Sequence, residues 1–119
     1  MPRRGQNFEG GYTPRRRDIV HLNWAPAVGH EMTNPHYGLV LSADKFNVGT
    51  RLCIVVPITS KGGKLSGFEL AVQAGRVNGA AILSAVRSID YQARDVQFED
   101  TVVSGLIAEA NRRICLIFS

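Results

Sequence analysis

The 119-residue sequence predicts a mainly β fold, a small SH3-like antiparallel barrel of roughly five to seven strands with one C-terminal helix. Short apolar segments with strand-like alternation recur between residues 18 and 98, and turn-forming residues separate them. After residue 101 the apolar residues instead recur at the helical period, which predicts one amphipathic helix packed on the sheet. Neither an internal repeat nor a second domain is recognisable in the sequence.

Six segments have the composition of strands: residues 18–24, 37–42, 52–58, 66–72, 80–86 and 93–98. In the first segment Val20, Leu22 and Trp24 share one face, and His21 and Asn23 share the other.

The segment 52–58 differs because it is an almost continuous apolar run of β-branched character, which predicts a strand buried on both faces. Pro57 cannot donate to a sheet ladder, so a bend or bulge is expected directly before Thr59. The preceding connection, residues 44–50, has room for a helical turn.

The C-terminal helix is expected to begin after Glu99, Asp100 and Thr101, which offer a cap and negative charge for its N-terminus. Its apolar face comprises Val103, Leu106, Ile107, Ala110 and Ile114. Arg112 and Arg113 suit the carbonyl end of the helix dipole.

The net charge of +4 comes entirely from the N-terminal segment. Residues 1–17 hold five arginines and one glutamate, a balance of +4, whereas residues 18–119 hold nine Lys/Arg and nine Asp/Glu, a balance of zero. We therefore expect residues 1–17 to form a basic, disordered tail that either steers RNA or an acidic partner or serves only as a solubilising leader.

Cysteine usage and hydropathy point to the cytoplasm. Cys53 and Cys115 are too few and too far apart for a disulfide framework or metal site, and both are expected to be small core residues in a reducing compartment. No apolar run approaches the roughly 18 residues of a membrane helix, and no secretory signal is recognisable. No metal or other cofactor is expected.

Three motifs within residues 29–60 indicate function. They are Gly29-His30-Glu31, the strand that ends Leu39-Val40-Leu41-Ser42, and Pro57-Ile58-Thr59-Ser60. This arrangement resembles the PemK/MazF/Kid family of toxin endoribonucleases, whose members read roughly "GHEQ…RPALVLS…VPITS"; Val86 to Arg94 resembles the family's "VRSID…AR". The resemblance covers residues 18–119 and implies a PemK/MazF/CcdB-like barrel.

What the resemblance implies is a homodimeric toxin that cleaves single-stranded mRNA without metal and is blocked by an antitoxin with an acidic, disordered C-terminal segment. A ribose 2′-hydroxyl attacks the adjacent phosphate, so the site needs a base, an acid and donors to the phosphate. Thr59 matches the family threonine and can donate to the phosphate, as can Ser60 beside it. The alternative is that Thr59 only caps the following turn.

His36 stands where the family usually has arginine. With a reference pKa of about 6.5, a histidine can exchange a proton near neutral pH, so His36 is a candidate general acid or base. Its alternative is a solvated residue at a strand start. The resemblance implies that His30 and Glu31 border the RNA groove, where either would orient His36 or act as acid or base; the alternative is a polar loop without a catalytic role.

The second departure from the family lies at residues 82–85, where relatives read "ADQV" and this chain has Ile-Leu-Ser-Ala. Ile82 and Ser84 occupy the positions of the arginine and aspartate that Kid-like members use in catalysis, and neither can do that acid–base work.

Arg87 is then the best candidate for a phosphate contact, with a surface salt bridge to Asp90 as its alternative. Lys61 and Lys64 are further backbone-contact candidates, and Tyr37, which replaces the family proline, can stack on a base.

Two functions therefore remain open. One is the endoribonuclease toxin. The other is a catalytically degenerate relative that binds an antitoxin, a nucleic acid or a protein target, in the manner of the gyrase poison CcdB.

Overall fold

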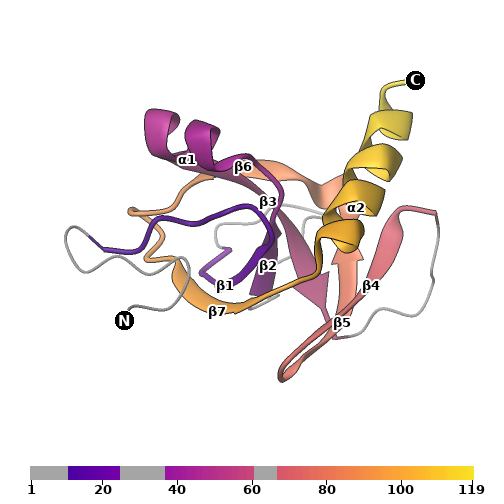
Figure 1. The fold of residues 1–119 in the computed structure, drawn as a ribbon, viewed down its shortest axis with the longest axis horizontal. Helices are drawn as coiled ribbons and strands as arrows, with labels where there is room; N and C mark the ends of the chain where they lie inside the picture. Colours follow the sequence, from indigo (N-terminus) through magenta and orange to yellow (C-terminus); the bar gives the residue numbers. More distant parts are fainter. Residues whose placement is uncertain (1–10, 25–36, 61–66) are drawn as a thin grey trace.

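The computed structural model describes residues 11–24, 37–60 and 67–119, which form a curled antiparallel sheet and a C-terminal helix (Figure 1). The seven strands are β1 (Asp18–His21), β2 (Tyr37–Val40), β3 (Leu52–Thr59), β4 (Glu69–Ala74), β5 (Val77–Ile82), β6 (Arg87–Asp90) and β7 (Gln97–Thr101). The helices are α1 (Asp44–Thr50), the short 3₁₀ helix η1 (Leu83–Ala85) and α2 (Ser104–Ile117). The predicted mainly β fold with a C-terminal helix is confirmed.

Strand β3 is the centre of the sheet because it has three neighbours. The strand order is β4-β5-β3-β2-β1-β7, and β6 pairs with β3 outside this order. On one side β3 pairs with β2; on the other side its first half, residues 52–55, pairs with β6 and its end, residues 58 and 59, pairs with β5.

Pro57 lies where β3 changes from one neighbour to the other. The pairing of β2 with β3 continues through Pro57 without a register shift, so the predicted bulge is not present in that ladder. A proline fits here because the position between the β6 and β5 ladders needs no donor on that side.

Two apolar clusters lie on opposite faces of the sheet. The first cluster lies between the sheet and α2 and includes Val56, Ile58, Val72, Ala81 and Ile107. The second cluster includes Val20, Trp24, Cys53, Val55 and Ile89. Because successive residues of β3 enter the two clusters alternately, the predicted burial of this strand on both faces is confirmed.

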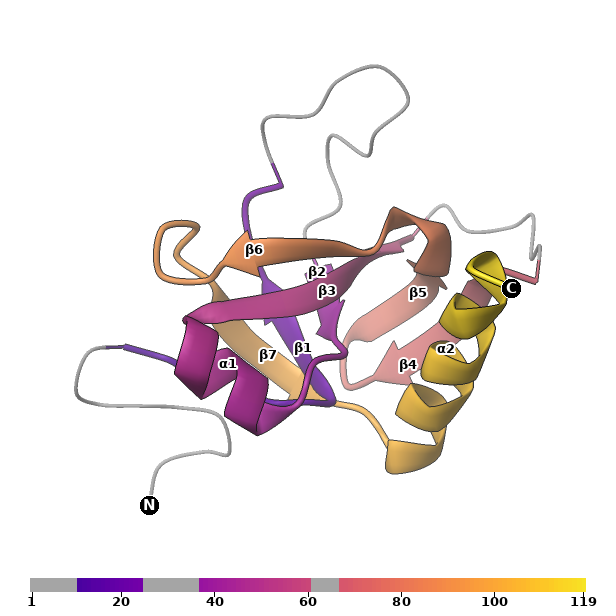
Figure 2. The same ribbon diagram turned by 90° about the horizontal axis from the view of Figure 1, so that it is seen from above.

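Figure 2 shows α2 beside β4 and α1 at the opposite end of the sheet. Burial also confirms the predicted faces of the first strand, since Leu22 and Trp24 join the second cluster while His21 and Asn23 are exposed.

The predicted strand at residues 93–98 is wrong for residues 93–96, and only residues 97 and 98 lie in a strand. The chain instead forms β6, a tight turn over residues 91–95 and then β7. The carboxylate of Asp90 accepts hydrogen bonds from two turn amides, and Tyr91 and Val96 on either side of the turn are buried in the second cluster. Because buried apolar residues stand at the start of this turn and directly after it, the segment resembles a strand in its local pattern.

The expected helix cap at residues 99–101 is also wrong, because these residues continue β7 in its ladder with β1. Helix α2 begins at Ser104 after Val103, and no side chain caps it. Ile107 and Ala110 are buried as predicted, whereas Val103 is 71% exposed. The backbone groups of Asp100 and Thr101 are satisfied by pairing with β1, so these residues extend the strand and do not start the helix.

The basic segment joins the domain earlier than its composition suggests. Pro14 is fully buried, and its carbonyl oxygen accepts a hydrogen bond of 2.8 Å from Asn47 Nδ2. The Tyr12 hydroxyl donates to Asp18 at 2.6 Å, and Arg17 Nε donates to the Val102 carbonyl at 2.8 Å. The predicted boundary at residue 17 therefore falls inside packed structure; residues 1–10 lie outside the described residues, and for them the tail remains a prediction.

The two cysteines differ. Cys53 is fully buried, and burial raises the pKa of its thiol to about 12. Cys115 is exposed, so the prediction that it is a core residue is wrong. It lies near the end of α2, where Leu116, Ile117 and Phe118 are also exposed because the helix extends beyond the sheet. In the described parts of the chain, no helix combines the length and apolar character required to cross a membrane.

Candidate functional site

Thr59 is the last residue of β3 and lies opposite Ala80 of β5. It is half-buried, and Ser60 directly after it is exposed. A β-carbon added to Gly79 would overlap the Thr59 carbonyl oxygen, so glycine allows β5 to approach the end of β3 this closely. The local fold therefore fixes the Thr59 backbone against β5, while the residue as a whole is only half-buried.

The outward residues of β3, β5 and β4 form one continuous surface, which we name the Thr59 face. On these strands Ile58, Ala81 and Val72 point into the first cluster. The residues next to them in sequence therefore point to the other side of the sheet, because side chains alternate along a strand. The Thr59 face comprises Thr59, Ala80, Asn78, Ile82, Glu69, Ala71 and Gln73. Its lining is mainly small and polar.

Arg87 lies on the same side of β3 as Thr59. It pairs with Val55, which is separated from Thr59 by four residues, about 13 Å along the strand. Arg87 Nη1 donates to the Trp24 carbonyl at 3.5 Å. No carboxylate of the described residues forms an ion pair with Arg87, and the Asp90 carboxylate accepts turn amides instead, so the surface salt bridge considered from the sequence is absent.

Tyr37 is not brought together with Thr59 and Arg87. It pairs with Ile58 and packs against the first cluster on the opposite face of the sheet. Its ring makes an edge contact with His21 at a centroid distance of 5.6 Å, and its hydroxyl interacts with Arg76. The ring proposed for base stacking is thus engaged within the fold.

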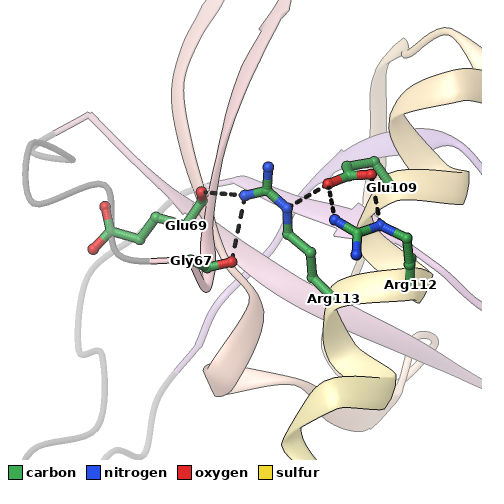
Figure 3. Close-up of polar contacts among 5 residues, drawn as sticks. All are labelled: Gly67, Glu69, Glu109, Arg112 and Arg113. Carbon is green, nitrogen blue, oxygen red and sulfur yellow. Dashed lines mark hydrogen bonds and ion pairs between the residues drawn. The ribbon is translucent and has the colours of Figure 1, made fainter.

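Three other arginines, Arg76, Arg112 and Arg113, form ion pairs with carboxylates. Arg76 binds Glu99 through two hydrogen bonds of 2.8 and 3.0 Å, and this partner raises the pKa of Arg76. Arg112 and Arg113 both donate to Glu109, which lowers the pKa of that carboxyl to about 2 (Figure 3). Arg87 therefore differs from these three arginines in having no ion pair with a carboxylate of the described residues.

Arg113 also reaches the edge strand β4. Its Nη1 atom donates to the carbonyl oxygens of Gly67 and Glu69, at 3.3 and 3.2 Å (Figure 3). A groove of about 580 Å³ lies between β4 and α2, lined by Gly67, Glu69, Leu70, Ala71, Arg112, Arg113 and Leu116. Arg113 thereby satisfies two outward carbonyls of an otherwise open sheet edge.

Sequence reasoning did not single out Glu69. The alternation of apolar Phe68, Leu70 and Val72 does place Glu69 on the outward side of β4, and this was the available signal. Figure 3 shows its carboxylate directed away from Arg113. The Oε1 atom is buried and has no hydrogen-bond partner among the described residues.

Five predicted site residues lie outside the described residues: His30, Glu31, His36, Lys61 and Lys64. Their roles remain predictions. The described residues directly before these two segments are Trp24, before residues 25–36, and Ser60, before residues 61–66. The Trp24 carbonyl contacts Arg87. In the described part of the chain, no group of three or more His, Cys, Asp or Glu side chains is placed to hold a metal ion.

With this geometry in view, comparison with known proteins identifies the family. Residues 15–118 match the family of PemK-like, MazF-like toxins of type II toxin–antitoxin systems. The chain belongs to this family. The match spans nearly the whole domain and includes Thr59, Arg87 and the three motifs noted in the sequence.

Among relatives, the Escherichia coli K12 endoribonuclease toxin MazF is 30% identical over 91 residues, covering 76% of this chain and 81% of MazF. The endoribonuclease toxin ChpB from the same strain is 32% identical over 104 residues, covering 83% and 89%. The Escherichia coli endoribonuclease PemK is 29% identical over 108 residues, covering 87% and 81%.

Solved structures agree with the fold. MazF from Deinococcus radiodurans superposes with a TM-score of 0.82 at 29% identity, covering 90% of this chain and 97% of that protein. A MazE–MazF structure from the same organism gives a TM-score of 0.75 at 25% identity, with the same coverage. The predicted PemK/MazF-like fold, mainly β with a C-terminal helix, is confirmed.

Proposed function

We propose that this protein is the toxin of a toxin–antitoxin pair and acts as a metal-independent endoribonuclease that cleaves single-stranded mRNA and so inhibits growth. The observation that carries this proposal is the family match, since three relatives named as endoribonucleases each align over at least 81% of their length. The alternative of a degenerate binding module is not favoured, because these relatives are named for an enzymatic activity.

The proposed chemistry is attack of a ribose 2′-oxygen on the adjacent phosphorus. The P–O5′ bond breaks, a base receives the 2′-hydroxyl proton, and an acid returns a proton to the departing 5′-oxygen. In this proposal Thr59 donates its hydroxyl hydrogen to the phosphate, with Ser60 as a second donor; their position at the exposed end of β3 supports this. We assign proton transfer to His36, with His30 and Glu31 as supporting groups, because the described residues of the Thr59 face include no histidine.

Further parts of the proposal concern binding. Arg87 supplies a charge for the RNA backbone, and Lys61 and Lys64 add to it. Tyr37 is a weaker candidate, because its ring packs on the other face of the sheet. A homodimer, a cognate antitoxin with an acidic segment and a cytoplasmic location complete the proposal; the MazE–MazF structures from Deinococcus radiodurans show relatives solved together with MazE.

The direct test uses purified protein, freed of antitoxin, with single-stranded RNA in EDTA across neutral pH. We expect cleavage, a loss of about 100-fold with Thr59→Ala, and a comparable loss with His36→Ala. Thr50→Ala is the matched control, because Thr50 is an exposed threonine of α1 whose hydroxyl donates to the Phe46 carbonyl. RNA left intact by the wild-type protein would refute the proposal. Mapping RNA ends after brief induction in cells then gives the cleavage motif.

A further inference from the structure

We propose that Glu69 is a specificity-determining residue whose carboxylate accepts hydrogen bonds from the amino edge of a base next to the cleaved nucleotide. This inference rests on the proposed endoribonuclease function. It assigns base discrimination to an acidic side chain of β4, separate from the candidate catalytic groups.

Strand register places Glu69 on the Thr59 face. Thr59 pairs with Ala80, and Ala80 pairs with Ala71 on β4. Glu69 lies two residues from Ala71 on the same strand and pairs with Ile82. Because side chains separated by two residues share a side, Glu69 and Thr59 face the same ligand space.

The burial of Glu69 indicates that the described residues do not supply every partner of its carboxylate. Its Oε1 atom is buried without a hydrogen-bond partner among the described residues, although an unsatisfied buried carboxylate oxygen is costly. The nearest cation does not compensate. Arg113 contacts the backbone carbonyl of Glu69, gives its charge to Glu109, and lies on the side from which the Glu69 carboxylate turns away (Figure 3).

Distance separates this role from catalysis. Two strand spacings across the sheet and two residues along it give a Cα separation between Thr59 and Glu69 of roughly 12 Å. A carboxylate so far from the threonine does not share its phosphate. The Glu69 carboxylate would also be repelled by phosphate oxygens. The edges of bases, in contrast, carry N–H groups that can donate to its Oε1 atom.

The chemistry of the bases sets the expected preference. Guanine offers two adjacent donors, N1–H and the N2 amino group, for a bidentate contact, and adenine and cytosine each offer one amino group. Uracil places carbonyl oxygens on both sides of its single N3–H, which disfavours a carboxylate. Ile82, cross-strand from Glu69, provides an apolar surface against which such a base can lie.

The experiment measures cleavage of single-stranded RNA libraries and equilibrium binding of uncleavable 2′-O-methyl oligonucleotides that differ at one position. It uses the full chain, Glu69→Gln and two controls. Gln97→Ala alters an exposed strand residue outside the Thr59 face, and Glu109→Gln removes a negative charge on α2. We expect Glu69→Gln to reduce discrimination between amino-bearing bases and uracil by about tenfold at one position, while both controls keep the wild-type preference.

The outcomes separate the two proposals. If Glu69→Gln cleaves with unchanged base preference, the readout role is overturned and the endoribonuclease function stands. If the wild-type protein cleaves nothing but binds with a base preference that Glu69→Gln removes, the endoribonuclease function fails and only the base contact of Glu69 is supported. If the wild-type protein shows neither binding nor cleavage, both are overturned. Tryptophan fluorescence of Trp24, the single tryptophan, verifies that each variant is folded.

Discussion

The two halves of β3 are both apolar, yet they have different surroundings. Residues 52–55 pair with β6, and Cys53 and Val55 are completely buried in the second cluster. At the other end Thr59 pairs with β5, and its side chain is half-buried on a face that carries few apolar groups. The candidate site therefore lies beyond the edge of the second apolar cluster, and the buried first half of β3 fixes its position.

The charged residues divide in the same way. On the side of α2, Arg112 and Arg113 are matched by Glu109. On the side of Thr59, Arg87 has no ion pair with a described carboxylate and Glu69 has an oxygen without a described partner. The arginines of α2 thus share a carboxylate partner, whereas Arg87 and the Oε1 atom of Glu69 have no such partner among the described residues.

The largest expected effect comes from comparing two isoleucines. Ile89 is buried in the second cluster under β3, whereas Ile82 is half-buried on the Thr59 face. Ile89→Ala should lower the free energy of unfolding by about 2–5 kcal/mol because it leaves a cavity. Ile82→Ala should cost less than about 1.5 kcal/mol, since solvent can enter the space. Urea unfolding followed by Trp24 fluorescence measures both, and equal losses would contradict the distinction between the two ends.

A second substitution targets the close approach of β5 to Thr59. Gly79→Ala places a β-carbon against the Thr59 carbonyl, so β3 or β5 must shift, and we expect a loss of about 1–3 kcal/mol together with reduced cleavage. Gly105→Ala in α2 is the control, because nothing lies within 4 Å of its added carbon and helix propensity should increase stability by about 1 kcal/mol. Unchanged stability and cleavage in Gly79→Ala would show that the approach is not constrained.

Arg87 and Arg112 provide the next comparison. Arg87→Gln should weaken RNA binding by about tenfold at low salt and reduce the slope of binding against salt concentration by about one, because one phosphate contact is lost. Arg112→Gln should leave binding close to wild type, since Glu109 already holds that charge. Fluorescence titrations at several salt concentrations test this, and equal losses in both variants would contradict a specific role for Arg87.

The smallest effect concerns Glu109. Its two arginine partners lower the pKa of the carboxyl from its usual value of 4.5 to about 2. A depressed folded-state pKa means that the carboxylate stabilises the fold above about pH 4.5 and loses this contribution as the pH falls through about 2. Glu109→Gln should therefore be slightly less stable than wild type at pH 7, and the difference should shrink at pH 4 and pH 3. A difference that stays constant with pH would exclude the ion pairs as its cause.

Local pattern predicted the elements that bury whole faces. The alternation in residues 18–24, the double-sided burial of residues 52–58 and the helical face around Ile107 are all present. It failed where local and tertiary demands differ. The turn at residues 91–95 was mistaken for a strand because Val96 is anchored in a core, and the expected cap at residues 99–101 is the end of β7 because β1 pairs with it.

For the candidate site, the motif around Thr59 was recognisable because its position depends on residues adjacent in the chain. Glu69 was not, because its relation to Thr59 passes through Ala80 and Ala71 on two other strands. The sequence also could not show that Tyr37 lies on the face opposite Thr59, because its side of the sheet follows from its pairing with Ile58.

The sequence by itself determined the mainly β class, the C-terminal helix, the double-sided burial of residues 52–58 and the family, because these follow from side-chain type and short-range spacing. Only the tertiary structure decided which charges are neutralised, where β3 changes its neighbour and which polar groups share a face with Thr59. Those features depend on strand register and on contacts between distant segments, which long-range pairing sets.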